Sequence, residues 1–215
     1  MKQLERLLAD TLLNISAIKL QPAIPFTWRS GWLSPIYNDH RRVLSYPKER
    51  NFIKVEIARI ILERFPQVDA IASVSTGAIA IGAMVADAIG VPFVYVRSTP
   101  KDHGLENSIE GNLKPRQKVV VIEDVVTTGA NALKAIATVK AAGCEVLGAV
   151  TIFSFEFREA IDAFLEENIP LVAMTTYDVV VDEVYQLGFI NEGEVKVLRQ
   201  WHKDPKNWKP APLDD

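Results

Sequence analysis

The stretch that decides the fold runs from Val119 to Asn131 and reads Val-Val-Val-Ile-Glu-Asp-Val-Val-Thr-Thr-Gly-Ala-Asn. Its first four residues are apolar and β-branched, which predicts a short buried strand. Two carboxylates, Glu123 and Asp124, follow the strand, and a Thr-Thr-Gly turn then leads into a helix-forming run over 130–142. Ligands of open α/β sheets bind outside the carboxyl ends of the strands. This turn is therefore the first place to look for a ligand site.

The turn suits a phosphate, whereas the two acids suit a sugar. Thr127, Thr128 and Gly129 open a helix, and the N-terminus of a helix offers free N–H groups and the positive end of the dipole. Glu123 and Asp124 would repel a phosphate, but they can accept hydrogen bonds from sugar hydroxyls or face positive charge that develops on a sugar ring. The combination predicts a phosphorylated sugar with cationic chemistry at its ring.

The rest of the chain alternates strand-like and helix-like segments, after an amphipathic helix predicted over 1–14. Strands are predicted at 70–74, 93–96, 118–122, 145–153 and 171–174, and helices at 78–89, 130–142, 156–168 and 178–187. Repeated β-α-β units indicate an α/β fold with a doubly wound, mainly parallel sheet flanked by helices. We expect a single domain over 1–215.

Two regions break this rhythm. Residues 98–116 are polar and rich in Pro and Gly, and such a long connection inside a domain predicts a functional lid loop. Residues 18–47 are rich in Pro and aromatic residues, which favours short strands and turns that form a hood over the sheet edge. The C-terminal piece, 192–215, is expected to start helical and end as a Pro-rich tail, and Trp201 and Trp208 indicate that it docks on something.

Composition excludes several classes of protein. The 215 residues are 48% hydrophobic and 24% charged, with a net charge of −3, which argues against a nucleic-acid binder. The single cysteine, Cys144, rules out an intrachain disulfide and a multi-cysteine metal site, and a small buried residue is favoured over a catalytic thiol. No targeting or membrane-spanning segment is recognised, so we expect a cytoplasmic location.

The stretch from Val119 to Asn131 closely resembles the motif that binds phosphoribosyl pyrophosphate in type I phosphoribosyltransferases. The stretch from Phe26 to Asp39 resembles the N-terminal signature of the orotate phosphoribosyltransferase family, and the stretch from Arg97 to Gly104 resembles its mobile catalytic loop. The three segments lie in the expected order. The resemblance implies the type I phosphoribosyltransferase fold. The implied activity is transfer of phosphoribosyl from phosphoribosyl pyrophosphate to orotate, giving orotidine monophosphate and pyrophosphate in UMP biosynthesis.

The same resemblance implies the binding residues for phosphoribosyl pyrophosphate. They are Arg97, Lys101, His103, Glu123, Asp124, Val125, Val126, Thr127, Thr128, Gly129, Ala130, Asn131, Ser75, Thr76 and Gly77. Of these, Lys101, His103, Glu123 and Asp124 are the implied catalytic residues. One departure stands out, since the family often has Lys after the matching arginine and Ser98 stands there.

For orotate, the resemblance implies Thr127, Arg29, Tyr37, Asn38 and, through a looser match, Arg158. Arg29 stands where relatives often have Lys, and an arginine can hold a carboxylate with two hydrogen bonds. Simpler interpretations remain open. Tyr37 can be a core tyrosine, Arg158 a surface residue at a helix start, Thr127 a helix cap, and the Ser75 turn a plain strand-to-helix connection.

The resemblance also implies a cofactor and a partner. We expect Mg²⁺ to be held through substrate oxygens, without dedicated protein ligands, and a homodimer whose lid loop is shared across subunits. The implied substrates are small molecules, with no nucleic acid and no membrane as partners. Two rival functions stay open, namely a phosphoribosyltransferase for another base, such as a purine, and a non-catalytic regulator that senses phosphoribosyl pyrophosphate and binds DNA or RNA.

Overall fold

The computed structural model describes residues 2–97 and 108–210. Contacts between Cα atoms divide the chain into two compact units. The smaller unit comprises residues 1–43 and 175–215, and the larger unit comprises residues 44–174. Most of the predicted hood therefore belongs to a unit that also contains the C-terminal segment, which the sequence analysis did not foresee. The single domain over 1–215 stays a prediction.

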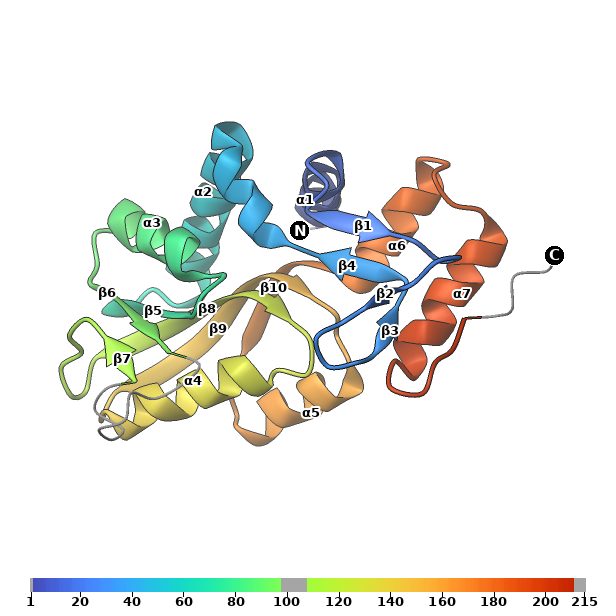
Figure 1. Cartoon of the computed structure of the whole chain (residues 1–215). Helices are drawn as coiled ribbons and strands as arrows, with labels where there is room; N and C mark the ends of the chain where they lie inside the picture. The colour runs from blue at the N-terminus through green and yellow to red at the C-terminus, as the bar shows by residue number, and fades with distance from the viewer. Residues whose placement is uncertain (1, 98–107, 211–215) are drawn as a thin grey trace. The chain divides into compact units, whose positions relative to one another are not determined.

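A six-stranded sheet forms the larger unit and confirms the predicted fold class (Figure 1). Its strands, in sheet order, are β10 (Leu171–Thr176), β9 (Glu145–Ser154), β8 (Lys118–Val126), β5 (Ala70–Val74), β6 (Phe93–Val96) and β7 (Ile109–Glu110). Strand β5 pairs in parallel with β6 and β8, β8 pairs in parallel with β9, and β7 runs antiparallel to β6. Every residue of β5 is buried, as expected for a parallel strand covered on both faces.

Four helices cover the two faces of this sheet. Helices α2 (Pro47–Arg64) and α3 (Ile79–Ile89) lie on one face, and α4 (Ala130–Ala141) and α5 (Arg158–Glu166) lie on the other (Figure 1). On the second face, small and branched side chains of α4 and the ring of Phe164 on α5 pack with the valines of β8 in one core. That core fixes the start of α4 against the end of β8.

Helix α2 was missing from the sequence analysis, which left residues 48–69 unassigned. Its apolar residues do not form one clean stripe. Ile53 and Ile57 are buried, whereas Val55 and Leu62 are about half exposed. A helix with apolar residues on several sides gives a weak helical period.

The end of β8 and the presence of β7 also differ from the prediction. Strand β8 continues through the acids to Val126, because Glu123 pairs with Thr151 and Val126 pairs with Ser154 of β9. Residues 109–110, inside the predicted lid, form strand β7 on the edge of the sheet. Both extensions come from pairing with a neighbouring strand, which local sequence does not specify.

Short strands and helices from both ends of the chain form the smaller unit. Strand β1 (Ile18–Leu20) pairs antiparallel with β4 (Ile36–Asn38), and β2 (Phe26–Thr27) pairs antiparallel with β3 (Leu33–Ser34). A 3-10 helix, His40–Ser45, follows β4. The helices are α1 (Lys2–Asn14), α6 (Tyr177–Gln186) and α7 (Glu192–Lys203), and α1 packs on α6. The strands β1 to β4 confirm the short strands and turns predicted for 18–47.

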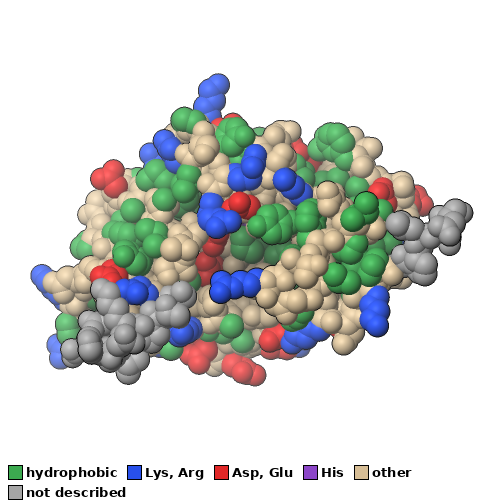
Figure 2. Space-filling model, viewed as in Figure 1, with side chains coloured by type: hydrophobic (Ala, Val, Ile, Leu, Met, Phe, Trp, Pro, Cys, Tyr) green, Lys and Arg blue, Asp and Glu red, His purple; other side chains and the backbone are tan. Residues whose placement is uncertain are grey.

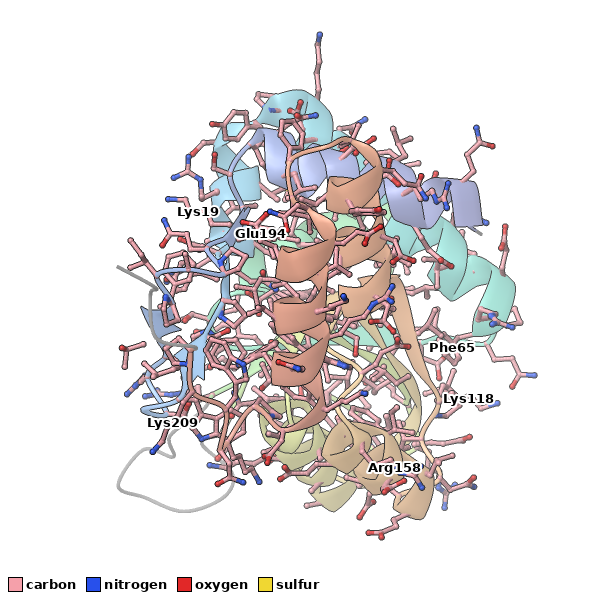
Figure 3. All side chains as sticks on the ribbon, turned by 90° about the vertical axis from the view of Figure 1, so that its right-hand side faces the viewer. Lys19, Phe65, Lys118, Arg158, Glu194 and Lys209 are labelled. Carbon is pink, nitrogen blue, oxygen red and sulfur yellow. The ribbon has the colours of Figure 1, made fainter. Side chains whose placement is uncertain are left out.

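Helix α7 docks on the β2–β3 hairpin through Trp201. The helix begins with a capping box between Asn191 and Glu194, the residue labelled on α7 in Figure 3. Trp201 is fully buried and its Nε1 donates to the Leu33 carbonyl at 2.9 Å. Its ring meets the edge of Trp28 at 5.5 Å between centroids. The docking expected for the C-terminal piece is thus confirmed at Trp201.

We expect Trp201→Phe to lower the free energy of unfolding by about 1–3 kcal/mol. The change leaves the Leu33 carbonyl without its donor and opens a small cavity. The measurement is urea unfolding followed by circular dichroism. Trp208→Phe is the matched control, because Trp208 is only half-buried, and should change stability by about 0.5 kcal/mol or less. Equal losses from the two changes would contradict the docking role of Trp201.

Candidate active site

Three of the predicted site segments meet at the carboxyl ends of neighbouring strands in the larger sheet. The strands β6, β5 and β8 are parallel neighbours, so their carboxyl ends lie side by side. Strand β6 leads into Arg97, β5 leads into the turn Ser75–Gly77, and β8 carries Glu123 and Asp124 near its end. The sheet therefore brings together residues as distant in sequence as Ser75 and Asp124.

The turn after β8 surrounds a hollow of about 80 Å³. Its lining consists of Glu123, Val125, Val126, Thr127, Thr128, Gly129, Ala130, Asn131 and Ala132. No side chain of the described residues caps α4 at its N-cap position, Gly129. The first N–H groups of a helix have no partner within the helix. The hollow thus meets the uncapped, positive end of α4, which suits a phosphate group.

Gly129 is required at this turn for two reasons. Its φ of +80° lies in the left-handed region, which glycine adopts without steric cost. A Cβ at this position would also lie 3.1 Å from the ring of Phe164 and 3.6 Å from Ala160, both on α5. Helix α5 thus packs against the turn at Gly129, a contact that sequence alone does not indicate.

The turn after β5 offers fewer donors than its sequence suggested. The N–H of Ser75 donates to the Val96 carbonyl of β6 at 3.0 Å, so it is not available to a ligand. No backbone carbonyl of the described residues accepts from the N–H groups of Thr76 and Gly77. Helix α3 has no side-chain cap either, within the same part of the chain. The available donors of this turn are therefore Thr76 and Gly77 at the start of α3.

Gly77 lies directly against the carboxylate of Asp124. A Cβ built on Gly77 would come within 2.1 Å of Asp124 Oδ2 and 2.4 Å of its Cγ. A separation this short is far below any van der Waals contact, so a side chain at position 77 would displace the Asp124 carboxylate. The turn after β5 and the acid at the end of β8 are thus adjacent in space.

The two acids lie in different environments. Glu123 is 6% exposed, whereas Asp124 is half-buried. The Asp124 N–H donates to Glu123 Oε1 at 3.2 Å. Burial of Glu123, reinforced by the neighbouring Asp124 carboxylate, raises the pKa of Glu123 well above its usual value. The pair therefore tends to keep a proton rather than carry two full negative charges.

Arg97, which follows the end of β6, forms an ion pair with Glu110. Its Nη1 lies 3.2 Å from Glu110 Oε1 on β7, and both side chains are about one-third exposed, at 31% and 33%. Its N–H donates to the Ser108 carbonyl at 2.8 Å. Sequence alone does not point to Glu110, because only the pairing of β7 with β6 brings it beside Arg97.

Other predicted residues lie elsewhere or outside the described part of the chain. Lys101, His103 and the departure at Ser98 fall outside the described residues. Arg158 begins α5, where its side chain is 86% exposed and pairs with Asp162 at 2.8 Å (Figure 3). This position matches the simpler interpretation, a surface residue at a helix start.

The predicted orotate residues of the hood belong to the smaller unit. Arg29 is exposed in the turn between β2 and β3. Tyr37 on β4 is 38% exposed with its ring centroid 5.5 Å from that of Phe26, so it is not a core tyrosine. Asn38 is half-buried, and both polar atoms of its amide are shielded and lack a partner among the described residues.

A second hollow and the surface charges bear on where a charged ligand can bind. The larger unit has a hollow of about 580 Å³ between β7 and α4, but no charged side chain lines it within the described residues, so it does not suit a phosphate. On the face drawn in Figure 2, Lys and Arg side chains are interspersed with acidic and hydrophobic ones.

None of the helices within residues 2–97 and 108–210 has the length and hydropathy of a membrane-spanning segment.

Comparisons with known proteins agree with this geometry. The phosphoribosyl transferase domain family matches residues 49–170. The orotate phosphoribosyltransferase of Phocaeicola vulgatus is 58% identical over 209 residues, which are 97% of this chain and 99% of that protein.

Two solved structures are similar in fold. The orotate phosphoribosyltransferase of Aeropyrum pernix has a TM-score of 0.74 at 26% identity, covering 86% of this chain and 99% of that one. The UMP synthase of Leishmania donovani has a TM-score of 0.76 at 26% identity, and the match covers 92% of this chain but 42% of the synthase. Sequence identity over nearly the full length, the domain match and the shared fold show that the chain belongs to the orotate phosphoribosyltransferase family.

Proposed function

We propose that the carboxyl ends of β6, β5 and β8 hold phosphoribosyl pyrophosphate while its phosphoribosyl group is transferred to orotate. In this reaction N1 of orotate gives up its proton and forms a bond with the anomeric carbon, and the bond from that carbon to the pyrophosphate oxygen breaks. Positive charge grows on the ribose ring and negative charge grows on the departing pyrophosphate. The contact of Gly77 with Asp124 carries the proposal, because it sets an anion-binding turn beside an acid.

The two uncapped helices divide the phosphates between them. The 5-phosphate fits the hollow at the start of α4, which Thr127, Thr128, Gly129, Ala130 and Asn131 line together with Val125 and Val126. The diphosphate takes the free N–H groups of Thr76 and Gly77, with Ser75 contributing its position rather than its N–H. The guanidinium of Arg97 adds a positive charge at the same edge.

Asp124 and Glu123 act on the ribose. Carboxylates close to the ring accept hydrogen bonds from its hydroxyls and stabilise positive charge in the transition state. The raised pKa of Glu123 supports unequal roles for the two acids. Asp124, which is the acid that lies against Gly77, is the one proposed to face the ribose ring.

Lys101 and His103 are the proposed catalytic residues for the leaving group. Donors are needed where negative charge accumulates on pyrophosphate. A lysine supplies a mobile point charge, and a histidine can donate a hydrogen bond or transfer a proton. This assignment is supported by the match of the Arg97–Gly104 segment to the catalytic loop of the family.

Arg29, Tyr37, Asn38 and Thr127 are the proposed orotate contacts. The exposed guanidinium of Arg29 suits the carboxylate of orotate. The amide of Asn38 supports a ligand site, since a shielded amide without a partner costs about 1–3 kcal/mol and the imide edge of a pyrimidine offers both a donor and acceptors. For Arg158, which pairs with Asp162, a contact with orotate rests on the resemblance alone.

Mg²⁺ is the proposed cofactor. Magnesium keeps several waters and binds readily to substrate phosphates, so the proposed ion needs no dedicated protein ligand. The diphosphate and ribose oxygens would supply most of the ligands. When bound, the ion neutralises negative charge on the diphosphate.

A homodimer is proposed, with the lid loop of one subunit serving the other. Helix α3 supports it, because Asp87 is its one charged residue and Ile79, Ala80, Ala83 and Met84 are only partly buried. A helix that is apolar on all sides usually packs on every side. A cytoplasmic location is also proposed, as the sequence led us to expect.

Asp124→Asn should lower kcat for orotate consumption by about 10²–10³-fold, because it removes charge that faces the forming ribose cation. The measurement is the loss of orotate absorbance with saturating phosphoribosyl pyrophosphate and Mg²⁺. Glu145→Gln is the control, since Glu145 is an exposed acid at the opposite end of the neighbouring strand β9. A kcat within about threefold of the wild type for Asp124→Asn would remove Asp124 from the mechanism.

Glu123→Gln should change how stability depends on pH. The raised pKa means that the folded state holds a proton that the unfolded chain releases, so the free energy of unfolding of the wild type falls as pH rises through this range. Glutamine removes that dependence. In urea titrations we expect Glu123→Gln to gain stability relative to the wild type as the pH rises above 4.5, the ordinary pKa of a glutamate. A difference that stays constant with pH, as expected for Glu145→Gln, would contradict the raised pKa.

Met84→Glu tests the dimer. A charge on the outer side of α3 should convert the dimer into a monomer, since an unpaired charge is costly to bury in an interface. Light scattering after size-exclusion chromatography measures the mass. Leu165→Glu on α5, where Leu165 is 71% exposed, is the matched control and should leave the mass unchanged. A Met84→Glu protein that remains dimeric would place the interface elsewhere.

A further inference from the structure

We propose that Glu110 is a positioning residue for phosphoribosyl pyrophosphate, because its carboxylate tethers Arg97 at the carboxyl end of β6, where the diphosphate binds. The inference rests on the proposed function of Arg97. None of the sequence signatures includes Glu110, which lies 13 positions from its partner.

The contact leaves most of the guanidinium available. Arg97 Nη1 donates to Glu110 Oε1 at 3.2 Å, and this is one of the five N–H donors of an arginine. Within residues 2–97 and 108–210, Glu110 is the one carboxylate paired with Arg97. The remaining donors can form the two parallel hydrogen bonds that arginine makes to phosphate oxygens.

The backbone around Glu110 holds the carboxylate in place. Glu110 pairs with Tyr95 and Ile109 pairs with Val96 across the β6–β7 ladder. Gly111 follows with a φ of +103°, and a Cβ there would lie 2.8 Å from Cγ1 of Val94. The close approach of Gly111 to β6 thus fixes the residue next to Glu110 on the sheet.

A tethered arginine binds an anion with a smaller entropy loss. Arginine has several rotatable bonds, and a long side chain that is already restricted loses less freedom when a ligand binds. The negative charge of Glu110 opposes this gain by repelling the diphosphate. Because both side chains are about one-third exposed, water and salt screen that repulsion. We therefore expect tethering to dominate.

Two substitutions separate tethering from charge. Glu110→Ala removes the tether, whereas Glu110→Gln removes the charge and keeps an oxygen that can accept from Nη1. We expect Glu110→Ala to raise KM for phosphoribosyl pyrophosphate, and Kd for inorganic pyrophosphate by calorimetry, by about threefold to tenfold, with kcat within about twofold. Glu110→Gln should stay within about twofold of the wild type on all three. Glu167→Ala, which breaks the Lys140–Glu167 pair of 2.8 Å, is the matched control and should change none of them.

A double-mutant cycle distinguishes positioning from a structural role. In an Arg97→Gln background, Glu110→Ala should have no further effect on KM, since the tether has nothing to hold. Two results would overturn the inference. One is Glu110→Ala that binds pyrophosphate as tightly as the wild type or more tightly, and the other is a KM effect that persists without Arg97. A wild type that consumes no orotate would instead refute the proposed function.

Discussion

The parallel pairing of β5 with β8 is the constraint on which the site depends. It sets the turn Ser75–Gly77 beside Asp124, at a distance that leaves no room for a Cβ on Gly77. The N–H groups of this turn suit an anion, whereas the carboxylate of Asp124 suits a positive charge. A ligand with a diphosphate at one position and a developing cation at the next satisfies both, and phosphoribosyl pyrophosphate is such a molecule.

The rest of the larger unit supports this edge. Phe164 and Ala160 of α5 pack under Gly129 and fix the turn that starts α4. Strand β6 contributes at two points, since its Val96 carbonyl accepts from Ser75 and its end carries Arg97. Burial of Glu123 raises its pKa and limits the negative charge beside the phosphates. The core thus sets both the shape and the charge of the site.

Local sequence predicted the elements of the larger sheet well, because its strands are short apolar runs and most of its helices have clear ends. Helix α3, for example, ends at Ile89, as predicted, and Gly90 follows in the left-handed conformation. The prediction was weaker where pairing or packing decides. Helix α2 has no clean apolar stripe, β8 continues through the acids because β9 lies beside it, and β7 exists only as a partner of β6.

The sequence by itself determined the fold class, the family and the residue types at the phosphate turn, because glycine, threonine and paired acids at that spacing serve a chemistry that few other patterns serve. Tertiary structure alone decided which of these groups are available. It showed that Ser75 has already used its N–H, that Arg158 pairs with Asp162 at the surface, and that Arg97 has a partner in Glu110. Hydrogen bonds and ion pairs between distant segments depend on distances that one-dimensional order does not contain.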